Sequence, residues 1–544
     1  MSDWNFGDVW DVVAASFPDR PAVIQGTTRV SWQAFERRAA SLAAALLDAG
    51  LGHQAKVAQY LYNCPAYLES VYGAFKAGLV PVNTNYRYTD DELVYLWDNS
   101  DSEAVIFDAA FSERVEAVRK RLPAVRLWLR VGPDSPATGS PAADWVTDYE
   151  AVVARGAEPP PRPRSGDDLL FIYTGGTTGM PKGVMWRQDD LFAVLNRTGE
   201  VRYPEDGGME GVRRTLQQPP KHPPARLLPG PPLMHGTGLF TAMSVLSGGG
   251  TVVMTDSHHF DPAALLDLVE AERVTQLCIV GDAFAKPILA ALDGQPGRWD
   301  LSSLWLIVSS GVMWSAEVKQ GLLRHNPKMM LVDTLGSSEA VGMARSTARA
   351  GQEVQTADFK LGADTKVLTD DGRELQPGST ERGRLAIRGR GPIGYYKDAE
   401  KSAATFTFID GQRWTIPGDF ATVAADGTVR LLGRGSVCIN SGGEKIFPEE
   451  VEEVLKLHPG VADAVVVGIP DDRFGEAVTA VIERRPGVSG IDHSELAEWV
   501  KGRLAAYKAP RRFVEVDSIG RSPAGKVDYR GLRSLAVERV ASAS

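Results

Sequence analysis

Residues 169–184 read LLFIYTGGTTGMPKGV, a short apolar run followed by a loop rich in glycine and threonine. The apolar run, residues 169–174, predicts a buried strand, so the loop would lie at the carboxyl end of that strand. Open α/β sheets bind their ligands at this end of the strands. The glycines let backbone N–H groups face an anion, and the threonine hydroxyls and Lys182 add donors and a positive charge. The stretch therefore predicts an α/β fold with a phosphate site at a strand end.

Three stretches match known nucleotide-binding patterns only in part. In residues 173–184 the lysine precedes a glycine, whereas the Walker loop has its lysine directly after one. Residues 520–527, GRSPAGKV, have the Walker spacing, but Val527 stands where a hydroxyl that binds magnesium belongs. Residues 389–394, GRGPIG, match the dinucleotide pattern, yet no apolar helix repeat follows them. Neither of the last two stretches predicts a nucleotide loop of those kinds.

Strand-like and helix-like patterns alternate over roughly the first 440 residues. Residues 35–51 form an amphipathic helix pattern that ends at Gly50, and residues 56–61 form a short buried strand pattern. Residues 261–281 begin with an N-cap aspartate and a proline at the first helical position, and a strand pattern follows the helix. Such alternation predicts βαβ units and mostly parallel sheets.

The pattern changes further along the chain. Residues 366–378 and 421–434 each contain an Asp-Gly turn between apolar runs, which predicts hairpins and an antiparallel, barrel-like subdomain. After them comes a small α/β domain, with a helix over 448–459, a strand over 461–471 and a helix over 494–510.

Composition also shapes the expectations for the whole chain. Proline-rich residues 158–168 and 217–232 predict exposed connectors. Residues 227–255 contain no charged side chain, but prolines and glycines interrupt them, so they predict a buried segment and no membrane span.

The composition also excludes several functional classes. The chain has 544 residues, a net charge of −10 and an isoelectric point near 5.5, which argues against a nucleic-acid partner. Its three cysteines are far apart and its histidines lack the spacing of metal ligands. The N-terminus lacks the basic and apolar regions of a signal peptide, and a reducing cytoplasm is expected.

Five motifs occur in an order that covers nearly the whole chain. They are YTGGTTGMPKG at 173–183, LGSSEA at 335–340, WTIPGD at 414–419, LLGRGSVCINSGGEKIFPEEVE at 431–452 and RSPAGK at 521–526. In this order they resemble the adenylate-forming enzymes, which comprise acyl-CoA synthetases, aryl-CoA ligases, firefly-type luciferases and peptide-synthetase adenylation domains. SSGVMWS at 309–315 and GYYKD at 394–398 look more closely like actinobacterial fatty-acyl-CoA ligases, which include activators of steroid side chains.

The resemblance implies a fold and a two-step reaction. A carboxylic acid would react with ATP to give an acyl-adenylate and pyrophosphate, and CoA would then form the thioester and release AMP. Residues 1–433 would form a large N-terminal domain of two βαβ-type sheets and a β-barrel-like subdomain, which binds ATP and the acid. Residues 434–544 would form a small mobile α/β domain that carries the catalytic lysine and the CoA side. The resemblance leaves open a homodimer and a peripheral contact with a membrane.

The family's functional residues map onto this chain motif by motif. Lys526, Glu339 and Thr178 would be catalytic, and Glu339 and Thr178 would also hold a magnesium ion. The residues implied for ATP are Thr174, Gly175, Gly176, Thr177, Thr178, Gly179, Lys182, Ser310, Gly311, Leu335, Gly336, Ser337, Ser338, Asp419, Arg434 and Lys526. The residues implied for the acyl pocket are His235, Phe240, Gly311, Val312 and Gly336, with Met234, Met313 and Trp314 near the acyl path. The residues implied for the CoA side and the hinge are Ser436, Gly442, Gly443, Glu444 and Lys445.

Some positions depart from the family pattern. Leu335 replaces the aromatic residue that usually stacks on adenine, and Pro417 replaces a threonine. Ser436 stands at the hinge position, where Asp or Lys is common. Taken singly, Glu339 could also cap a helix, Lys526 could face solvent, and His235 could be structural.

Other functions remain open at the level of sequence. An adenylation enzyme that loads a carrier protein, a non-catalytic sensor of acyl-adenylates or lipids, and a luciferase-type oxidation use the same fold. Residues 442–452, GGEKIFPEEVE, favour CoA ligases over carrier loading. A sensor would be expected to lose Lys182 or Lys526, and both are present. An acid–CoA ligase for a large apolar acid is therefore the preferred hypothesis.

Overall fold

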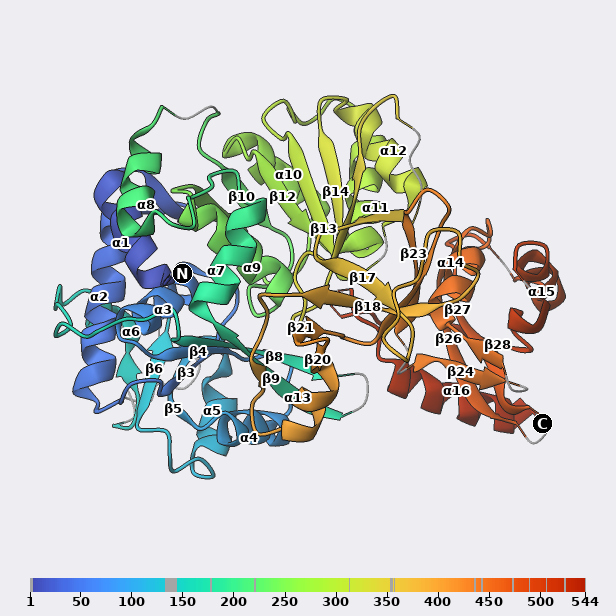
Figure 1. Ribbon diagram of the computed structural model, residues 1–544, viewed down its shortest axis with the longest axis horizontal. Coiled ribbons are helices and arrows are strands. Elements are labelled where there is room, and N and C mark those ends of the chain that lie inside the picture. The colour runs from blue at the N-terminus through green and yellow to red at the C-terminus, as the bar shows by residue number, and fades with distance from the viewer. Residues whose placement is uncertain are drawn as a thin grey trace. The chain divides into compact units, whose positions relative to one another are not determined.

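The computed structural model divides the chain into two compact units (Figure 1). The first unit comprises Met1–Thr174, Met180–Thr356 and Arg388–Thr415, and the second comprises Gly175–Gly179, Ala357–Ile387 and Ile416–Ser544. The structure describes residues 3–132, 144–176, 179–219, 222–312, 314–352, 356, 358–434, 437–441, 444–471, 474–488, 490–504, 506–522 and 525–543.

One sheet of the first unit is parallel at its centre. Its strands run in the order β2-β1-β11-β10-β12-β13-β14-β15, and only the outer strands β2 and β15 are antiparallel to their neighbours. The strands are β1 (Pro21–Gln25), β2 (Thr28–Ser31), β10 (Arg226–Pro229), β11 (Thr251–Met254), β12 (Gln276–Ile279), β13 (Leu306–Ser310), β14 (Met330–Leu335) and β15 (Ala344–Ala348). The helices that alternate with them are α9 (Gly236–Ser247), α10 (Pro262–Ala271), α11 (Gly281–Gly294) and α12 (Ala316–His325). Figure 1 shows α10, α11 and α12 beside β12, β13 and β14.

The second sheet of the first unit holds the glycine-rich stretch. Its strands run in the order β19-β9-β8-β4-β3-β5-β6-β7. They are β3 (Lys56–Tyr60), β4 (Val80–Asn83), β5 (Ser102–Asp108), β6 (Leu127–Val131), β7 (Thr147–Asp148), β8 (Leu169–Gly176), β9 (Gly179–Arg187) and β19 (Gly394–Tyr395). The strand expected at 169–174 is confirmed as β8, which extends to Gly176. The loop expected after it is wrong from Gly179 onward, because strand β9 begins there and contains Lys182.

Further helices and one hairpin complete the first unit. The helices are α1 (Phe6–Ser16), α2 (Trp32–Asp48), α3 (Pro65–Lys76), α4 (Asp90–Asn99), η1 (Ala109–Phe111), α5 (Ser112–Arg119), α6 (Tyr149–Val153), α7 (Gln188–Thr198), α8 (Gly208–Gln217) and α13 (Ala399–Thr405). The hairpin is β20 (Phe406–Ile409) with β21 (Gln412–Thr415). Local sequence explains where α10 begins: the Asp261 carboxylate caps the helix by accepting from Ala263 N–H and Ala264 N–H, and Pro262 is its first residue.

The second unit contains an antiparallel sheet. Its strands β16 (Asp358–Leu361), β17 (Thr365–Leu368), β18 (Gly383–Arg388), β22 (Asp419–Val423) and β23 (Val429–Arg434) pair in the order β16-β23-β22-β18-β17. The hairpin predicted at 421–434 is confirmed, because β22 and β23 pair around the turn at Gly427. The hairpin predicted at 366–378 is confirmed as a short one. The chain turns at Gly372, and Leu368 and Glu374 form an antiparallel bridge, whereas the longer antiparallel partner of β17 is β18.

The second unit also contains a smaller α/β sheet, of order β25-β24-β27-β26 with β28 beside β27. Its strands are β24 (Ile439–Ser441), β25 (Glu444–Ile446), β26 (Val461–Asp471), β27 (Gly475–Arg484) and β28 (Arg512–Val516). Its helices are α14 (Pro448–Lys456), α15 (His493–Lys501), η3 (Ala506–Lys508) and α16 (Tyr529–Ala543). The predicted helix at 448–459 and strand at 461–471 are confirmed, and the second predicted helix ends at Lys501, before Gly502.

One expected connector is wrong. Residues 217–232 were predicted to be exposed, but β10 lies within them and is a central strand whose Leu227 and Leu228 are almost fully buried. The prolines flank this strand, and only Pro229 belongs to it, as its last residue. The other predicted connector, residues 158–168, has no regular structure and is mostly exposed up to residue 163, as expected. The exposure expected for its last part is wrong at Gly166 and Asp168, which are buried.

The uncharged stretch 227–255 is a buried segment, as its composition indicated. It contains β10, α9 and β11, and α9 packs its apolar residues into the core of the first unit. Within the described parts of the chain, every helix is too short or too polar to span a bilayer.

Candidate active site

The carboxyl ends of β13 and β14 bring several predicted residues together. Ser310, the last residue of β13, lies opposite Thr334 of β14, so it is next to Leu335. After β14 the chain makes a tight turn, in which Ser337 N–H donates to Ala340 O at 2.9 Å. A Cβ on Gly336 would lie 2.8 Å from that same oxygen, so the turn requires glycine.

The start of α9 lies beside these two strand ends. Gly311 has a φ of +96°, and a Cβ there would lie 4.0 Å from Thr237 Oγ1 of α9. A Cβ on Gly236 would lie 3.5 Å from Ser338 Oγ. His235 is the N-cap residue of α9 and is half-buried. The structure therefore groups His235 with the segments around Gly311 and Ser338.

The residues expected near the acyl path are largely packed. Phe240 of α9 is buried, and its ring meets Trp186 edge-on at a centroid distance of 6.4 Å. Met234 and Trp314 are also buried, whereas Val312 is only partly buried. Met313 lies outside the described residues. Core packing explains Phe240, Met234 and Trp314 without a ligand, so their contact with an acid stays a prediction.

Lys182 of β9 forms an ion pair with Asp398. The Lys182 Nζ–Asp398 Oδ2 distance is 2.5 Å, and both side chains are partly exposed. Asp398 is also the N-cap of α13, where its carboxylate accepts from Lys401 N–H at 3.0 Å. The hydrogen bond from Lys182 is the main reason that the pKa of Asp398 is lowered. Lys182, which is predicted to bind phosphate, therefore already has an anionic partner.

Glu339 is held by a hydrogen bond from β19, the two-residue strand beside β9. Tyr395 of β19 is buried, and its hydroxyl donates to Glu339 Oε1 at 2.8 Å. β19 pairs antiparallel with β9 through Tyr395 and Val184. In addition, Trp186 of β9 donates from Nε1 to Ser338 O at 2.8 Å. The strand pair β9–β19 thus links Lys182 to the segment of Glu339.

Asn83 is a buried polar residue that sequence reasoning missed. Its Nδ2 donates to Tyr173 O at 2.9 Å and to Met234 O at 2.6 Å, and its Oδ1 accepts from Tyr173 N–H at 2.6 Å. It therefore ties the end of β8 to the residues before α9. Asn83 belongs to no motif, and its place at the end of β4 is the one signal that could have found it. For Tyr395 and Asp398, the signal was the GYYKD stretch.

The second unit carries the other predicted residues. Asp419 and Arg434 lie directly opposite each other across the hairpin β22–β23. Glu444 and Lys445 belong to β25, and Lys526 is exposed beyond β28. Gly175, Gly176 and Gly179 cluster with this unit, whereas Thr174 belongs to the first. Predicted residues that lie outside the described parts of the chain are Thr177, Thr178, Ser436, Gly442 and Gly443.

A magnesium ion fits these residues only with help from phosphate oxygens. Among the described residues, no group of three or more His, Cys, Asp or Glu side chains could hold a metal ion by itself. Magnesium in nucleotide sites is usually held by one or two carboxylates and substrate phosphates, and Glu339 is such a carboxylate. Two residues before Glu339, the buried Ser337 hydroxyl has no hydrogen-bond partner among the described residues, which fits a ligand atom at this strand end.

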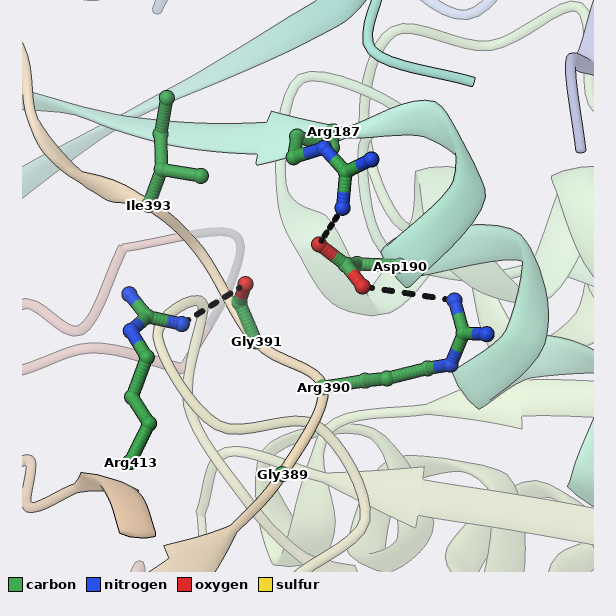
Figure 2. Close-up of a pocket in the computed structure, with 7 residues that line it drawn as sticks. All are labelled: Arg187, Asp190, Gly389, Arg390, Gly391, Ile393 and Arg413. Carbon is green, nitrogen blue, oxygen red and sulfur yellow. Dashed lines mark hydrogen bonds and ion pairs between the residues drawn. The ribbon is translucent and has the colours of Figure 1, made fainter. Parts of the chain in front are cut away.

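A cavity of about 430 Å³ lies elsewhere, at the end of β9 that is distant from Lys182 (Figure 2). Figure 2 shows Arg187 and Arg390 on either side of Asp190, at 3.0 and 3.4 Å. Arg413 points to Gly391 O at 3.4 Å. Two of its three arginines are thus paired with aspartate, and none of the predicted site residues lines the cavity, so it is not the candidate site.

Comparisons with known proteins bear on both units. The family profile described as "AMP-binding enzyme" matches residues 10–396, and "AMP-binding enzyme C-terminal domain" matches residues 450–526. The chain is 40% identical, over 99% of its length and 97% of the relative's, to a medium/long-chain-fatty-acid–CoA/3-oxocholest-4-en-26-oate–CoA ligase of Mycolicibacterium smegmatis. It is 39% identical, over 97% of its length and 95% of the relative's, to a 3-oxocholest-4-en-26-oate–CoA ligase of Rhodococcus rhodochrous.

Solved structures show the same fold. An anthranilate CoA ligase in complex with anthranoyl-AMP superposes with a TM-score of 0.83 at 21% identity, over 99% of each chain. A fatty acyl CoA synthetase of Mycobacterium tuberculosis superposes with a TM-score of 0.71 at 22% identity, over 98% of this chain and 99% of the other.

Proposed function

The chain belongs to the AMP-binding enzyme family, and on this premise we propose that it activates medium- or long-chain fatty acids or a steroid side-chain acid. It is an AMP-forming acyl-CoA synthetase, which uses ATP, Mg²⁺ and CoA. The observation that carries the substrate proposal is the 40% identity to a ligase for such acids over 99% of this chain. Carrier loading and a sensor role are not favoured, because the relatives that match nearly the full length are CoA ligases.

The screen that tests the substrate measures pyrophosphate release. Acetate, octanoate, dodecanoate, palmitate, benzoate and 3-oxocholest-4-en-26-oate are each supplied with ATP and Mg²⁺, with and without CoA. We expect the longer fatty acids or the steroid acid to give the highest kcat/KM, since burying apolar surface contributes about 25 cal/mol per Å². A strong preference for acetate or benzoate would overturn the substrate proposal and leave the enzyme class intact.

The first half-reaction brings two anions together, so the site must supply positive charge and oriented donors. We assign Lys182 and the 173–183 loop to the β- and γ-phosphates of ATP, and Glu339 with Thr178 to Mg²⁺. Asp419 would accept hydrogen bonds from the ribose hydroxyls, with Arg434 as a further donor. Support for Asp419 and Arg434 comes from their placement opposite each other on one hairpin.

The remaining assignments complete the site. Adenine and the acyl group would lie along the strand-end segments of Ser310 to Val312 and Leu335 to Ser338, with His235 at the mouth of the acyl pocket. Glu444 and Lys445 would lie on the CoA side, with Gly442 and Gly443. A homodimer, a peripheral membrane contact and a cytoplasmic location belong to the same proposal.

Lys526 would bridge the carboxylate of the acid and the α-phosphate. Losing one preorganised contact to developing charge typically lowers a rate by about 100- to 1,000-fold. We therefore expect Lys526→Ala to reduce acid-dependent pyrophosphate release by that factor. Thioester formation from supplied acyl-adenylate should continue near the wild-type rate, because the electrophile is then already activated.

Two further variants serve as comparisons for Lys526→Ala. Lys501→Ala removes an exposed lysine of the same unit that pairs with Glu498, and it should change neither step. Lys182→Ala should weaken ATP handling and have less effect on a reaction that starts from the adenylate. If Lys526→Ala slows both half-reactions equally, or neither, the role given to Lys526 is wrong.

A further inference from the structure

Lys526 closes a short loop whose two ends bind each other. Ser522 N–H donates to Lys526 O at 2.8 Å, and Lys526 N–H donates back to Ser522 Oγ at 3.0 Å. Gly525 precedes the lysine with a φ of +68°, and its N–H donates to Ser522 O at 2.8 Å. The backbone at Lys526 is therefore fixed by hydrogen bonds, although the residue itself is exposed.

Arg521 anchors the loop on its N-terminal side. Its guanidinium binds both oxygens of Asp463, from Nε at 2.5 Å and from Nη2 at 2.9 Å. Its remaining terminal nitrogen, Nη1, donates to Gly525 O at 3.2 Å. One planar guanidinium thus connects β26 to the residue directly before Lys526. Asp463 adjoins a register irregularity between β26 and β27, and a bulge of this kind re-aims a strand's side chains.

Tyr529 anchors the chain on the other side of the lysine. Its hydroxyl donates to Glu452 Oε1 at 3.0 Å. Glu452 lies on α14, is 4% exposed, and also accepts from Val466 N–H of β26 at 2.9 Å. The chain on both sides of Lys526 is therefore attached to β26, through Asp463 and through Glu452.

The charges of these anchors are consistent with tight, oriented contacts. Burial by itself would raise the pKa of Asp463, but the hydrogen bond and charge of Arg521 outweigh it, so the pKa is lowered. Burial raises the pKa of Glu452 despite the nearby Lys456. The Arg521–Asp463 ion pair is only partly buried, with side chains that are 18% and 20% exposed, and an ion pair that reaches solvent adds little net stability. The arrangement is therefore better explained by the position that it fixes than by stability.

We propose that Asp463, Arg521, Glu452 and Tyr529 are positioning residues that hold Lys526 for the adenylation half-reaction. This inference rests on the role proposed above for Lys526. A clamp of this kind limits how far the lysine backbone can move, and a displacement of about 1 Å in a positioned group can reduce a rate by about 100-fold. The clamp has no part in the second half-reaction, where Lys526 is not required.

The experiment measures both half-reactions of the full chain, with dodecanoate and ATP for the first and dodecanoyl-adenylate and CoA for the second. Asp463→Asn, Arg521→Lys and Tyr529→Phe should each slow pyrophosphate release by roughly 10- to 100-fold. Each should leave thioester formation near wild type. The matched control is Lys508→Gln, which breaks the Lys508–Glu450 pair at 2.6 Å, a similarly buried pair of the same unit. It should change neither rate.

A double variant separates positioning from general structure. If the clamp acts through Lys526, Arg521→Lys should slow pyrophosphate release no further once Lys526→Ala is present. Additive losses, equal losses in both half-reactions, or wild-type rates in all three clamp variants would overturn the clamp. If Asp463→Asn does not fold, Tyr529→Phe decides the question, because it removes one hydroxyl only. If Lys526→Ala leaves pyrophosphate release unchanged, the role proposed for Lys526 is wrong. The positioning role of the clamp is then wrong as well, because it depends on Lys526.

Discussion

Gly183, in the glycine-rich stretch, has a packing reason to lack a side chain. A Cβ at this position would lie 2.7 Å from Cε2 of the Tyr173 ring, which is buried under β9. The Tyr173 hydroxyl is in turn bound to Asn99 Oδ1 at 2.7 Å, so the ring cannot easily turn away. At least one glycine of this stretch therefore has a role in packing the sheet.

We expect Gly183→Ala to lower the free energy of unfolding by about 1–3 kcal/mol, which is the usual effect of overpacking a core. Urea denaturation without ATP measures it. Gly52→Ala is the control, because a Cβ there would have no atom within 4 Å. Equal stability of the two variants would show that Gly183 has no packing role.

Tyr395 gives a second test, directed at the metal. Its hydroxyl donates to Glu339 Oε1, and a hydrogen bond to a charged group contributes about 1.5 kcal/mol. We expect Tyr395→Phe to raise the Mg²⁺ concentration for half-maximal pyrophosphate release by roughly tenfold, the factor that this energy represents. Tyr396→Phe, which removes a hydroxyl bound to Asp101 at 2.6 Å, should leave it unchanged. If Tyr395→Phe leaves the Mg²⁺ requirement unchanged, the assignment of Glu339 to the metal ion is wrong.

The residues that sequence reasoning named and those that it missed differ in a physical way. Lys182 and Glu339 stand in motifs whose chemistry is local, so their type and spacing could be recognised. Their partners Asp398 and Tyr395 are 216 and 56 residues away, and only the pairing of β19 with β9 brings them close. The sequence gives even less indication of the role of Asn83. Its three hydrogen bonds join segments that are far apart in the chain, and no local sequence pattern connects them.

Strand β10 shows why the proline-rich composition of residues 217–232 led to a wrong prediction. Prolines usually interrupt sheets because they cannot donate a hydrogen bond, and they favoured a connector here. In β10 the internal positions are Leu227 and Leu228, which pair with the neighbouring strand, while the proline falls at the end. A four-residue strand between proline clusters is too short for its apolar pattern to outweigh them. The longer αβ segments, such as 261–281, carried caps and periodicity together and were predicted correctly.

Strand β14 and helix α12 share a buried ion pair that makes stability depend on pH. Lys319 Nζ lies 3.1 Å from Asp333 Oδ2, and the two side chains are 2% and 5% exposed. Burial raises the pKa of Asp333 from 3.8 to about 6, and Asp282 adds to the rise although Lys319 opposes it. A carboxyl whose pKa is higher in the folded state stabilises fully below its unfolded pKa. That contribution is lost as the pH rises through about 6.

We expect this loss to reach about 3 kcal/mol between pH 4 and pH 7. It is measured as the difference in unfolding free energy between the wild type and Lys319→Met/Asp333→Asn, which has no titrating group at this place. Urea denaturation at several pH values gives both curves. Two curves that stay parallel over this range would show that Asp333 does not titrate there.

The division of the molecule into an N-terminal α/β part and a smaller C-terminal part followed from the order of strand and helix patterns. The boundary at 433 and 434 is less simple, since the second compact unit also includes Ala357–Ile387 and begins again at Ile416. A compact unit is defined by its contacts, whereas the predicted boundary concerns where the chain rotates. Position 434 therefore stays a prediction about motion.

Ser436 is the proposed hinge of that motion. It lies outside the described residues, between β23 and β24, which belong to different sheets of the second unit. Lys526 is assigned to the first half-reaction, and Glu444 and Lys445 are assigned to the CoA side, so the small domain would have to turn between the steps. Proline fixes φ near −65° and would oppose such a turn. Ser436→Pro should therefore slow thioester formation from supplied dodecanoyl-adenylate while largely sparing pyrophosphate release from dodecanoate and ATP.

Ser436→Ala keeps φ free and should resemble the wild type in both assays. Equal slowing of both steps in Ser436→Pro would mean that the residue is structural and is not the hinge.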